Sequence, residues 1–371
     1  MVVLSSLGSP QWRINTSTQS KQYLTLHTLE SIHPTDIFAL APTPSSILTG
    51  SGSSTIQIHS TVPPTNPSAP STTSPAKAAT TAIDGAGGQS NEQGKEFAKL
   101  QELKAAHALG CHHIAVARET FRRAASVGFG GEVKLWAYTA DETWIEEMIE
   151  LDMPLDGKTT KKAGEAWAVA LSYNGRFLAS TTHDGRINVW ELEGSDAGKR
   201  IREYETKGSW GMCIDISADG RFTASGHENG SLYIFNNDTG RLLHSLPSLL
   251  RPVRSVAFSP HTTLLAAAGD SRTIALYEVS SGEQVANLAG HSAWILSIDF
   301  NSTGEYLLSG GFDGRAKVWN VGTRTCVVTH GESEKPLWVV RWLPKIGGRS
   351  EMFVVAGGTG GVGVLREASG G

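Results

Sequence analysis

The sequence lacks several features that would assign a class at once. No stretch approaches the roughly 18 apolar residues of a membrane span, and the opening MVVLSSLGSPQWR has no basic segment before a long apolar core. The 371 residues carry 32 Lys+Arg against 36 Asp+Glu, a net charge of −4. We therefore expect no membrane insertion, no secretion and no global attraction to nucleic acid.

Cysteine is scarce, and no C-x-x-C pair occurs. Cys111, Cys213 and Cys326 are widely spaced, which fits a reducing compartment and excludes a disulfide framework. Cys111 is followed directly by His112 and His113, but adjacent residues are not spaced to converge on one metal ion. The sequence predicts no metal and no cofactor.

Enzyme motifs are also missing. Gly358, Gly360 and Gly363 fit the G-x-G-x-x-G pattern of dinucleotide sites, but the chain ends before the helix that such a site needs for the pyrophosphate. His183 and Asp184 lie in a repeated turn, and neither G-x-S-x-G nor H-E-x-x-H occurs. We predict that the protein is not an enzyme.

The sequence does contain internal repeats. GHSAWILSIDFNSTGEYLLSGGFDGRAKVWNV (290–321) and AWAVALSYNGRFLASTTHDGRINVWEL (166–192) share an alternating strand, a turn, a strand of small residues, Asp-Gly-Arg and a strand ending in Trp. Most spacings between units are close to the roughly 40 to 45 residues of one propeller blade. The fold predicted is all-β, a seven-bladed β-propeller. The positions aligned with the final Trp of these two units, one for each of the seven units, are His59, Trp136, Trp190, Phe235, Tyr277, Trp319 and Leu365.

These units resemble the WD-repeat family from about residue 22 onward. The resemblance implies a buried hydrogen-bonded set of His, Ser or Thr, Asp and Trp within a blade, with a structural role. One blade matches all four positions and another matches three, whereas four blades have another residue in place of Asp and are expected to depend more on apolar packing. The full set is His291, Ser309, Asp313 and Trp319, the partial set is Ser180, Asp184 and Trp190, and the replacements are Gly130, Asn229, Ser271 and Thr359.

The domain organisation follows from the repeats. Residues 1–21 are expected to form an N-terminal tail and residues 22–371 a single propeller. The stretch 63–95 is rich in Pro, Ser, Thr, Ala and Gly and predicts a disordered loop in blade one, and 139–165 predicts a long connection between blades two and three. The last blade is one strand short, so the alternating run QYLTLHTLE (22–30) is predicted to complete it and close the ring.

Without a catalytic group, function is predicted on one rim of the central channel, where the chain enters each innermost strand. Four Trp in the repeat alignment reach this rim, and aromatics with a few charges are typical of protein-binding hot spots. The residues predicted to bind a partner are Asp36, His113, Trp167, Trp210, Met212, Arg254, Trp294, Leu296 and Trp338.

Three segments narrow the resemblance. HPTDIFAL, LWVVRWLP and the C-terminal LREASGG look like the WD-repeat subunits of the superkiller (Ski) complex. That resemblance implies a non-catalytic cytoplasmic and nuclear scaffold that binds a tetratricopeptide-repeat subunit and an RNA helicase in exosome-mediated mRNA decay, and in fungi the meiotic double-strand-break protein. It also implies a partner peptide with Gln-Arg and a nearby aromatic, with Asp36 pairing the Arg and the four Trp providing apolar walls.

Other interpretations stay open. A ubiquitin-ligase substrate receptor or a chromatin reader with an aromatic cage would have the same composition. An enzyme using the channel would need convergent titratable groups, and direct RNA binding would need a basic rim. The predicted rim offers only Asp36, His113 and Arg254 for either purpose, so direct contact with nucleic acid is not expected.

Overall fold

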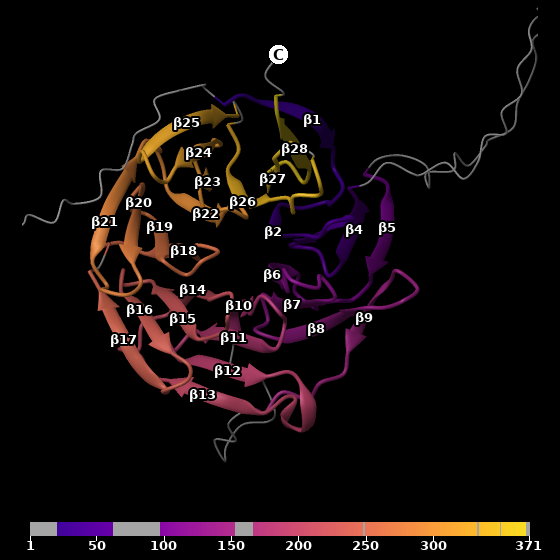
Figure 1. Ribbon diagram of the computed structural model, residues 1–371. Helices are drawn as coiled ribbons and strands as arrows, with labels where there is room; N and C mark the ends of the chain where they lie inside the picture. Colours follow the sequence, from indigo (N-terminus) through magenta and orange to yellow (C-terminus); the bar gives the residue numbers. More distant parts are fainter. Residues whose placement is uncertain are drawn as a thin grey trace, which may run out of the picture.

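The computed structural model describes residues 21–61, 97–152, 166–247, 249–331, 334–348 and 350–368. Seven antiparallel sheets of four strands surround a central axis, as Figure 1 shows face-on. The predicted all-β, seven-bladed propeller is confirmed, and helix in the described residues is limited to one 3₁₀ turn, η1 (Gly194–Asp196). Most of the predicted tail (1–20) and the whole predicted loop 63–95 lie outside the described residues.

Each blade runs from an inner to an outer strand in chain order, except the last. Blade one consists of β2 (Ile37–Pro42), β3 (Ser46–Ser51), β4 (Ile56–Ser60) and β5 (Lys99–Leu103). Blade two consists of β6 (Cys111–Val116), β7 (Arg123–Gly128), β8 (Val133–Tyr138) and β9 (Trp144–Glu147). Blade three consists of β10 (Ala166–Leu171), β11 (Phe177–Thr182), β12 (Ile187–Glu191) and β13 (Arg200–Tyr204).

The other four blades follow the same plan. Blade four consists of β14 (Gly211–Ile216), β15 (Phe222–His227), β16 (Leu232–Asn236) and β17 (Arg241–Leu246). Blade five consists of β18 (Val253–Phe258), β19 (Leu264–Gly269), β20 (Thr273–Glu278) and β21 (Gln284–Ala289). Blade six consists of β22 (Ile295–Phe300), β23 (Tyr306–Gly311), β24 (Ala316–Asn320) and β25 (Thr325–His330). Blade seven consists of β26 (Leu337–Trp342), β27 (Met352–Gly357), β28 (Val362–Glu367) and β1 (Tyr23–Leu29).

The ring closes through its first strand. β1 pairs antiparallel with β28, with Tyr23 opposite Glu367, and thereby becomes the outer strand of blade seven as the sequence predicted. Lys21 Nζ lies 3.0 Å from a Glu351 oxygen and 3.1 Å from a Glu367 oxygen. The Tyr23 ring packs against Phe353 at 5.0 Å between centroids. An unpaired β28 edge is thus avoided.

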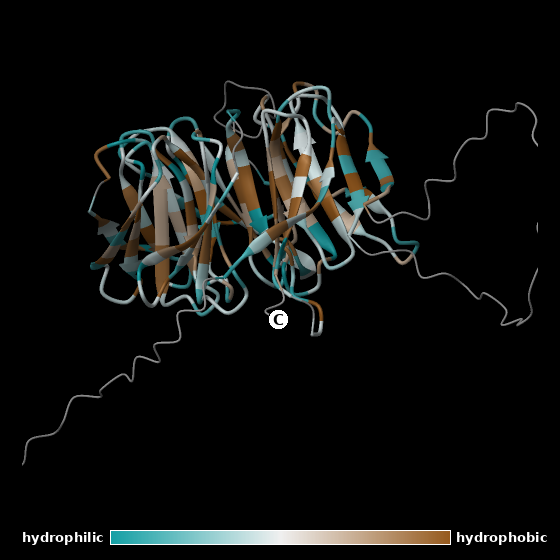
Figure 2. Cartoon of the chain, turned by 90° about the horizontal axis from the view of Figure 1, so that it is seen from above, coloured by the Kyte–Doolittle hydropathy of each residue, from teal (hydrophilic) through white to brown (hydrophobic). Residues whose placement is uncertain are grey.

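The core lies between blades rather than within them. One buried cluster, for example, joins Leu48 and Ile58 of blade one to Ile114 and Trp136 of blade two. The second strands carry small residues because neighbouring blades approach closely there; a Cβ added at Gly310 would lie 2.4 Å from a Val340 methyl carbon. Figure 2 shows the ring edge-on, with apolar and polar residues interspersed along the strands.

Inner strands of adjacent blades are also joined by polar side chains. Asp215 accepts the backbone N–H of Phe258 at 2.8 Å, and Asp299 accepts that of Trp342 at 2.9 Å. Asp299 also receives an Arg118 guanidinium N–H at 2.8 Å. Buried carboxylates are tolerated here because each meets fixed donors. These bonds hold the ends of the inner strands in a set order around the channel.

The predicted four-residue set is assembled in blade six. The Trp319 indole N–H donates to Ser309 Oγ at 2.8 Å, and His291 Nε2 lies 2.8 Å from the same oxygen. The other ring nitrogen of His291 donates to Asp313 at 2.9 Å. All four polar groups therefore find partners inside the blade.

Blade two corrects one expectation. Gly130 stands at the Asp position, yet the set still forms: Trp136 donates to Ser126 Oγ at 2.7 Å, and His107 Nε2 lies 2.7 Å from that oxygen. Glu132 substitutes for the missing Asp, since its carboxylate lies 3.0 Å from His107 Nδ1. The longer Glu side chain compensates for its place two residues further along.

Blade three corrects another expectation. Ser180 and Trp190 do not bond to each other: the Trp190 indole N–H donates to the Asp152 carbonyl at 2.9 Å, and Ser180 Oγ has no partner among the described residues. Asp184 instead accepts the Thr182 hydroxyl within its own turn. Ser180, Asp184 and Trp190 therefore lie in one blade without forming the predicted set.

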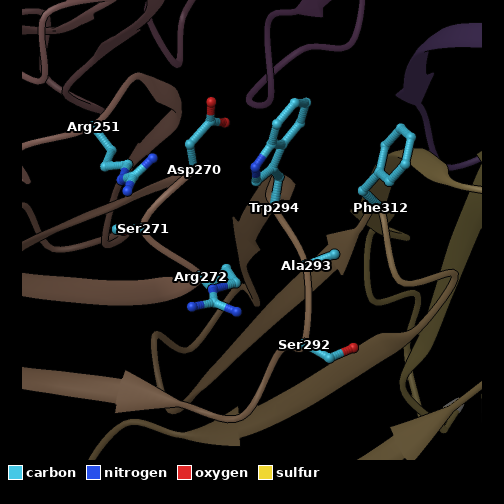
Figure 3. A pocket seen from close by; sticks show the side chains of 8 residues that line it. All are labelled: Arg251, Asp270, Ser271, Arg272, Ser292, Ala293, Trp294 and Phe312. Carbon is cyan, nitrogen blue, oxygen red and sulfur yellow. The ribbon is translucent and has the colours of Figure 1, made fainter.

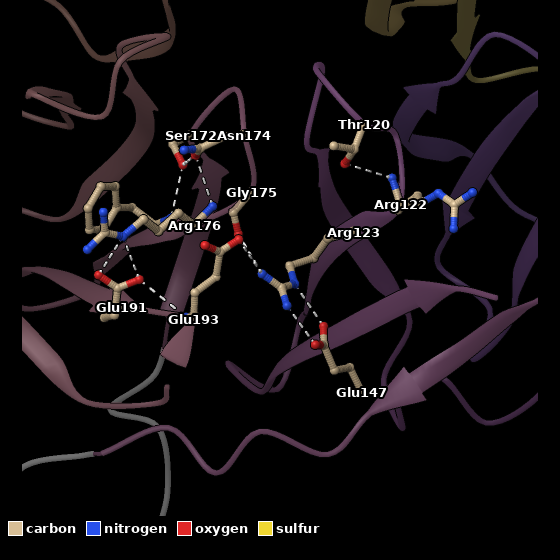
Figure 4. Close-up of polar contacts among 11 residues, drawn as sticks. Thr120, Arg122, Arg123, Glu147, Ser172, Asn174, Gly175, Arg176, Glu191 and Glu193 are labelled. Atoms are coloured by element: carbon tan, nitrogen blue, oxygen red, sulfur yellow. Dashed lines mark hydrogen bonds and ion pairs between the residues drawn. The ribbon is translucent and has the colours of Figure 1, made fainter. Parts of the chain in front are cut away.

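The predicted connection 139–165 is shorter than expected. Residues Trp144–Glu147 within it form β9, the outer strand of blade two, and 153–165 lie outside the described residues. The alternation of apolar and polar residues that marks a strand is absent from this segment, because only Trp144 of β9 is buried. Figure 4 shows how Glu147 of β9 receives Arg123 in a two-pronged ion pair at 2.8 and 2.9 Å, while Arg123 also donates to the Gly175 carbonyl of blade three.

Candidate protein-binding face

The chain topology brings two kinds of loop to one face of the ring. The loop that enters each inner strand and the turn between the second and third strands lie at the same end of a blade, because inner and second strands are antiparallel. Trp210 and Trp294 immediately precede inner strands, and Phe129 and Phe312 lie in such turns. We call this surface the rim face.

A β-bulge shapes the rim face in every blade. The pairing register between the inner and second strands shifts at the start of each of the seven inner strands, as between Ile37 and Ala39 or Ile295 and Ser297. Bulges redirect side chains at functional edges of sheets. The second residue of each inner strand stands at this shift: Phe38, His112, Trp167, Met212, Arg254, Leu296 and Trp338.

Five of these seven residues are the ones that the repeat alignment predicted for the rim, and two are not. His112, not His113, is equivalent to Leu296, since Cys111 and Ile295 occupy the same register position opposite the last residue of their second strands. Phe38 takes the place predicted for Asp36 for the same reason. Asp36 aligns instead with Trp210 and Trp294, directly before an inner strand. The β-bulge is common to all seven blades, so it is the pairing of each inner strand with its second strand that identifies the equivalent residues of blades one and two.

Aromatic rings contact one another in one continuous series along the rim face. Trp210 packs on Trp167 at 4.7 Å between centroids, Trp167 on His112 at 4.2 Å, and His112 on Phe129 at 4.8 Å. Phe38 continues the series, with its ring centroid 5.4 Å from that of Phe129 and 5.3 Å from that of Trp338. Phe312 then lies 6.3 Å from Trp338 and 5.7 Å from Trp294. The aromatic arc thus consists of Trp210, Trp167, His112, Phe129, Phe38, Trp338, Phe312 and Trp294.

Four members of the arc were not identified from the sequence. Phe129 and Phe312 are 39% and 45% exposed, which is unusual for phenylalanine, and Trp294 beside them is 45% exposed. A signal was present: Phe129, His183 and Phe312 occupy the same turn position directly before the Gly or Asp of each unit. Phe38 and His112 are the other two residues missed, through the alignment errors in blades one and two.

Two ionic features interrupt the apolar arc. Asp36 accepts the Trp338 indole N–H at 2.9 Å, which fixes its carboxylate beside the arc. Arg254 donates to the Asp270 carboxylate through two nitrogens, and its guanidinium lies 4.9 Å from the Trp294 ring centroid. A cation above an indole face is attracted by the ring quadrupole. Trp294 is therefore held by Arg254 while its other surface remains exposed.

Two polar atoms of the arc lack partners within the described chain. His112 Nε2 donates to the Trp167 carbonyl at 2.5 Å, but its Nδ1 is buried and unpaired, as is the Trp210 indole N–H. Burial lowers the pKa of His112 to about 4, so the ring is neutral at physiological pH. Buried unpaired polar groups are rare in folded proteins and call for an explanation.

His113 lies on the same inner strand but turns away from the arc. Its Nδ1 accepts the Val169 backbone N–H at 3.4 Å, which joins blades two and three. Burial, with the nearby Arg341 charge, lowers the pKa of His113 to about 3. It is not part of the contiguous aromatic surface, unlike its neighbour His112.

The described residues contain no group of three His, Cys, Asp or Glu side chains placed to hold a metal ion. Gly358 to Gly363 span the turn from β27 into β28, so a strand follows where a dinucleotide site needs a helix. Within the same part of the chain, no helix is long and apolar enough to cross a bilayer. The arrangement that the structure does provide is a wide aromatic surface with sparse charges, which suits contact with protein.

Comparison with known proteins agrees with this geometry. The WD domain, G-beta repeat model matches residues 157–191, 240–278 and 282–320. The meiotic recombination protein rec14 of Schizosaccharomyces pombe is 36% identical over 337 residues, covering 91% of this chain and 95% of that protein. The chain belongs to the WD-repeat family.

Two further WD-repeat relatives are more distant. The antiviral protein SKI8 of Saccharomyces cerevisiae is 28% identical over 277 residues, covering 60% of this chain and 68% of SKI8. The WD repeat-containing protein SL1-17 of Schistosoma mansoni is 30% identical over 142 residues, 38% of this chain and 44% of that protein. The likeness to SKI8 confirms the resemblance to superkiller WD-repeat subunits that HPTDIFAL, LWVVRWLP and LREASGG indicated. As a member of the WD-repeat family, this protein is a scaffold.

Proposed function

We propose that this WD-repeat protein is a non-catalytic scaffold that captures short segments of partner proteins on its rim face. The observation that carries the proposal is the aromatic arc, in which eight rings from six blades and their loops form one connected surface. Large rings give apolar contact area at low entropic cost. The unpaired His112 Nδ1 is free to accept a hydrogen bond from a bound segment, and the unpaired Trp210 indole N–H is free to donate one.

The names of the relatives support two settings for this scaffold. One relative acts in meiotic recombination and another is an antiviral SKI protein. We propose that this chain serves both in a superkiller complex that supports exosome-mediated mRNA decay and in meiotic recombination. The partners are then a tetratricopeptide-repeat subunit, an RNA helicase and, in meiosis, the double-strand-break protein. These roles place it in the cytoplasm and the nucleus, without direct binding to nucleic acid or membrane.

Asp36 has a defined place in the proposed site. One of its oxygens is occupied by Trp338, and the carboxylate keeps further acceptor positions for a cationic group. Trp338, which packs against Phe38 and Phe312, gives it an apolar neighbour, and lower local polarity strengthens an ion pair relative to open water. We therefore propose that Asp36 binds an Arg of the partner and that the neighbouring rings hold an aromatic side chain.

An affinity pull-down with the full chain tests the proposal. Tagged wild type and the variant Trp294→Ala/Trp338→Ala are incubated with source-cell lysate, with and without RNase. We expect wild type to recover a superkiller-type helicase and a tetratricopeptide protein in an RNase-resistant manner, and the variant to lose them. A matched variant, Leu242→Ala/Leu243→Ala, removes exposed apolar residues from the outer strand β17 and should keep both partners. Recovery of a ubiquitin ligase or chromatin assembly instead would overturn the assignment.

A further inference from the structure

A hollow of about 400 Å³ opens on the rim face between blades five and six. Arg251, Ser271 and Arg272 belong to the blade-five side, and Trp294 and Phe312 belong to the blade-six side, as Figure 3 shows. The hollow is continuous with the aromatic arc because both include Trp294 and Phe312.

The hollow carries an excess of positive charge. Asp270 is the acidic residue in its wall, but its carboxylate is already engaged by the guanidinium of Arg254. Arg251 and Arg272 are exposed, and neither guanidinium has an ion-pair or hydrogen-bond partner among the described residues. Two uncompensated arginines therefore face the same space, although the chain as a whole carries a net charge of −4.

We propose that Arg251 and Arg272 bind a carboxylate side chain, Asp or Glu, of the partner segment. This inference rests on the proposed function, since it concerns the same segment lying across the aromatic arc. A guanidinium fork donates two parallel N–H bonds to a carboxylate, and a second arginine adds charge. The Trp294 and Phe312 rings cover one side of the hollow with apolar surface.

The two charged positions together give the bound segment a direction. Asp36 lies where blade seven meets blade one, beside Trp338, whereas Arg251 and Arg272 lie at blade five, beyond Trp294. A segment with its cation at Asp36 and its acid at the hollow places its apolar residues over Trp338, Phe312 and Trp294. The reverse orientation would put like charges together at both ends, which costs binding free energy.

Fluorescence anisotropy with the full chain tests the inference. Four labelled peptides share a core with one Arg and one aromatic residue, and carry three Glu or three Gln either before or after that core. We expect one Glu peptide, in one order only, to bind about 10-fold more tightly than its Gln counterpart. That advantage should disappear in Arg251→Gln/Arg272→Gln, whereas the Gln peptide should bind this variant and wild type equally.

A charge-matched control separates local from general electrostatics. Arg241→Gln/Lys345→Gln removes two exposed cations from outside the hollow and should keep the Glu advantage. An equal loss in this control, or no Glu advantage in either order while the Gln peptides still bind, would overturn the carboxylate site and leave the aromatic site standing. Failure of all four peptides to bind wild type would contradict the proposed binding face itself, and this inference with it.

Discussion

The indole N–H of Trp338 donates to Asp36 Oδ2 at 2.9 Å, across a sequence separation of 302 residues. This bond links the inner strand of blade seven to the loop that enters blade one, at the seam where the ring closes. It also positions a carboxylate beside Trp338, whose ring centroid lies 5.3 Å from that of Phe38. One contact thus serves closure of the fold and the shape of the rim face.

Changing Asp36 should separate these two roles. Asp36→Asn keeps an oxygen that can accept the Trp338 N–H but removes the charge, so we expect unchanged stability and weaker partner capture. Asp36→Lys should abolish capture, because it places a cation where the proposed partner presents one. Pull-down efficiency and the thermal midpoint are measured for both variants. Undiminished capture by a folded Asp36→Lys protein would remove Asp36 from the site.

The two buried serines of the repeat should differ sharply in their effect on stability. Ser309 Oγ bonds to both His291 and Trp319, whereas Ser180 Oγ has no partner within the described chain. Ser309→Ala leaves two buried groups unpaired and should lower the free energy of unfolding by about 1 to 3 kcal/mol. Ser180→Ala, at an equally buried site, should change it by less than about 0.5 kcal/mol. Urea denaturation of the pair measures this contrast, and equal losses would refute the stated roles.

Removal of the closing strand should open the ring. A chain lacking residues 1–30 loses β1, exposes the backbone edge of β28 and loses the contacts of Tyr23 with Trp342 and Phe353. We expect a marked fall in the thermal midpoint and concentration-dependent association through the exposed edge. A synthetic peptide of residues 21–30 added in excess should restore the midpoint, because it can pair with β28 in trans. A truncated chain of wild-type stability would contradict strand closure.

Stability should fall on mild acidification. Burial lowers the pKa of His33, His59 and His112 to about 4 and that of His113 to about 3. These rings stay neutral in the folded chain, while the unfolded chain binds protons below pH 6.5, so each histidine lowers stability as the pH falls from 6.5 toward its folded-state pKa. A fully suppressed histidine costs about 2 kcal/mol at pH 5.

Asp215 acts in the opposite direction. Burial raises its pKa to about 6, so the folded chain holds this proton between pH 3.8 and 6 and gains stability there as the pH falls. Several histidines outweigh one carboxyl, and we expect a lower urea midpoint at pH 5.0 than at pH 7.5. Asp215→Asn, whose amide oxygen can still accept the Phe258 N–H, should steepen the loss. Equal midpoints at the two pH values would show that the histidines are accessible to protons.

The sequence by itself determined the repeat, the number of blades and the closing strand. Apolar alternation, small residues in second strands and aromatics at the end of third strands recur locally, and each follows from how one blade packs on the next. The run QYLTLHTLE was recognisable because a ring with a strand missing at one end needs a donor at the other. Four rim tryptophans followed from the same alignment.

Only the tertiary structure decided which neighbours occupy the rim and which polar groups meet. Strand pairing puts His112 and Phe38, rather than His113 and Asp36, at the second position of their inner strands. Glu132 reaches His107 although it is displaced from the Asp position, and Trp190 bonds to Asp152 rather than Ser180. Such pairings depend on side-chain length and on the loop packed alongside, which are three-dimensional properties. The joining of Trp338 to Asp36 exists because the ring brings its two ends together.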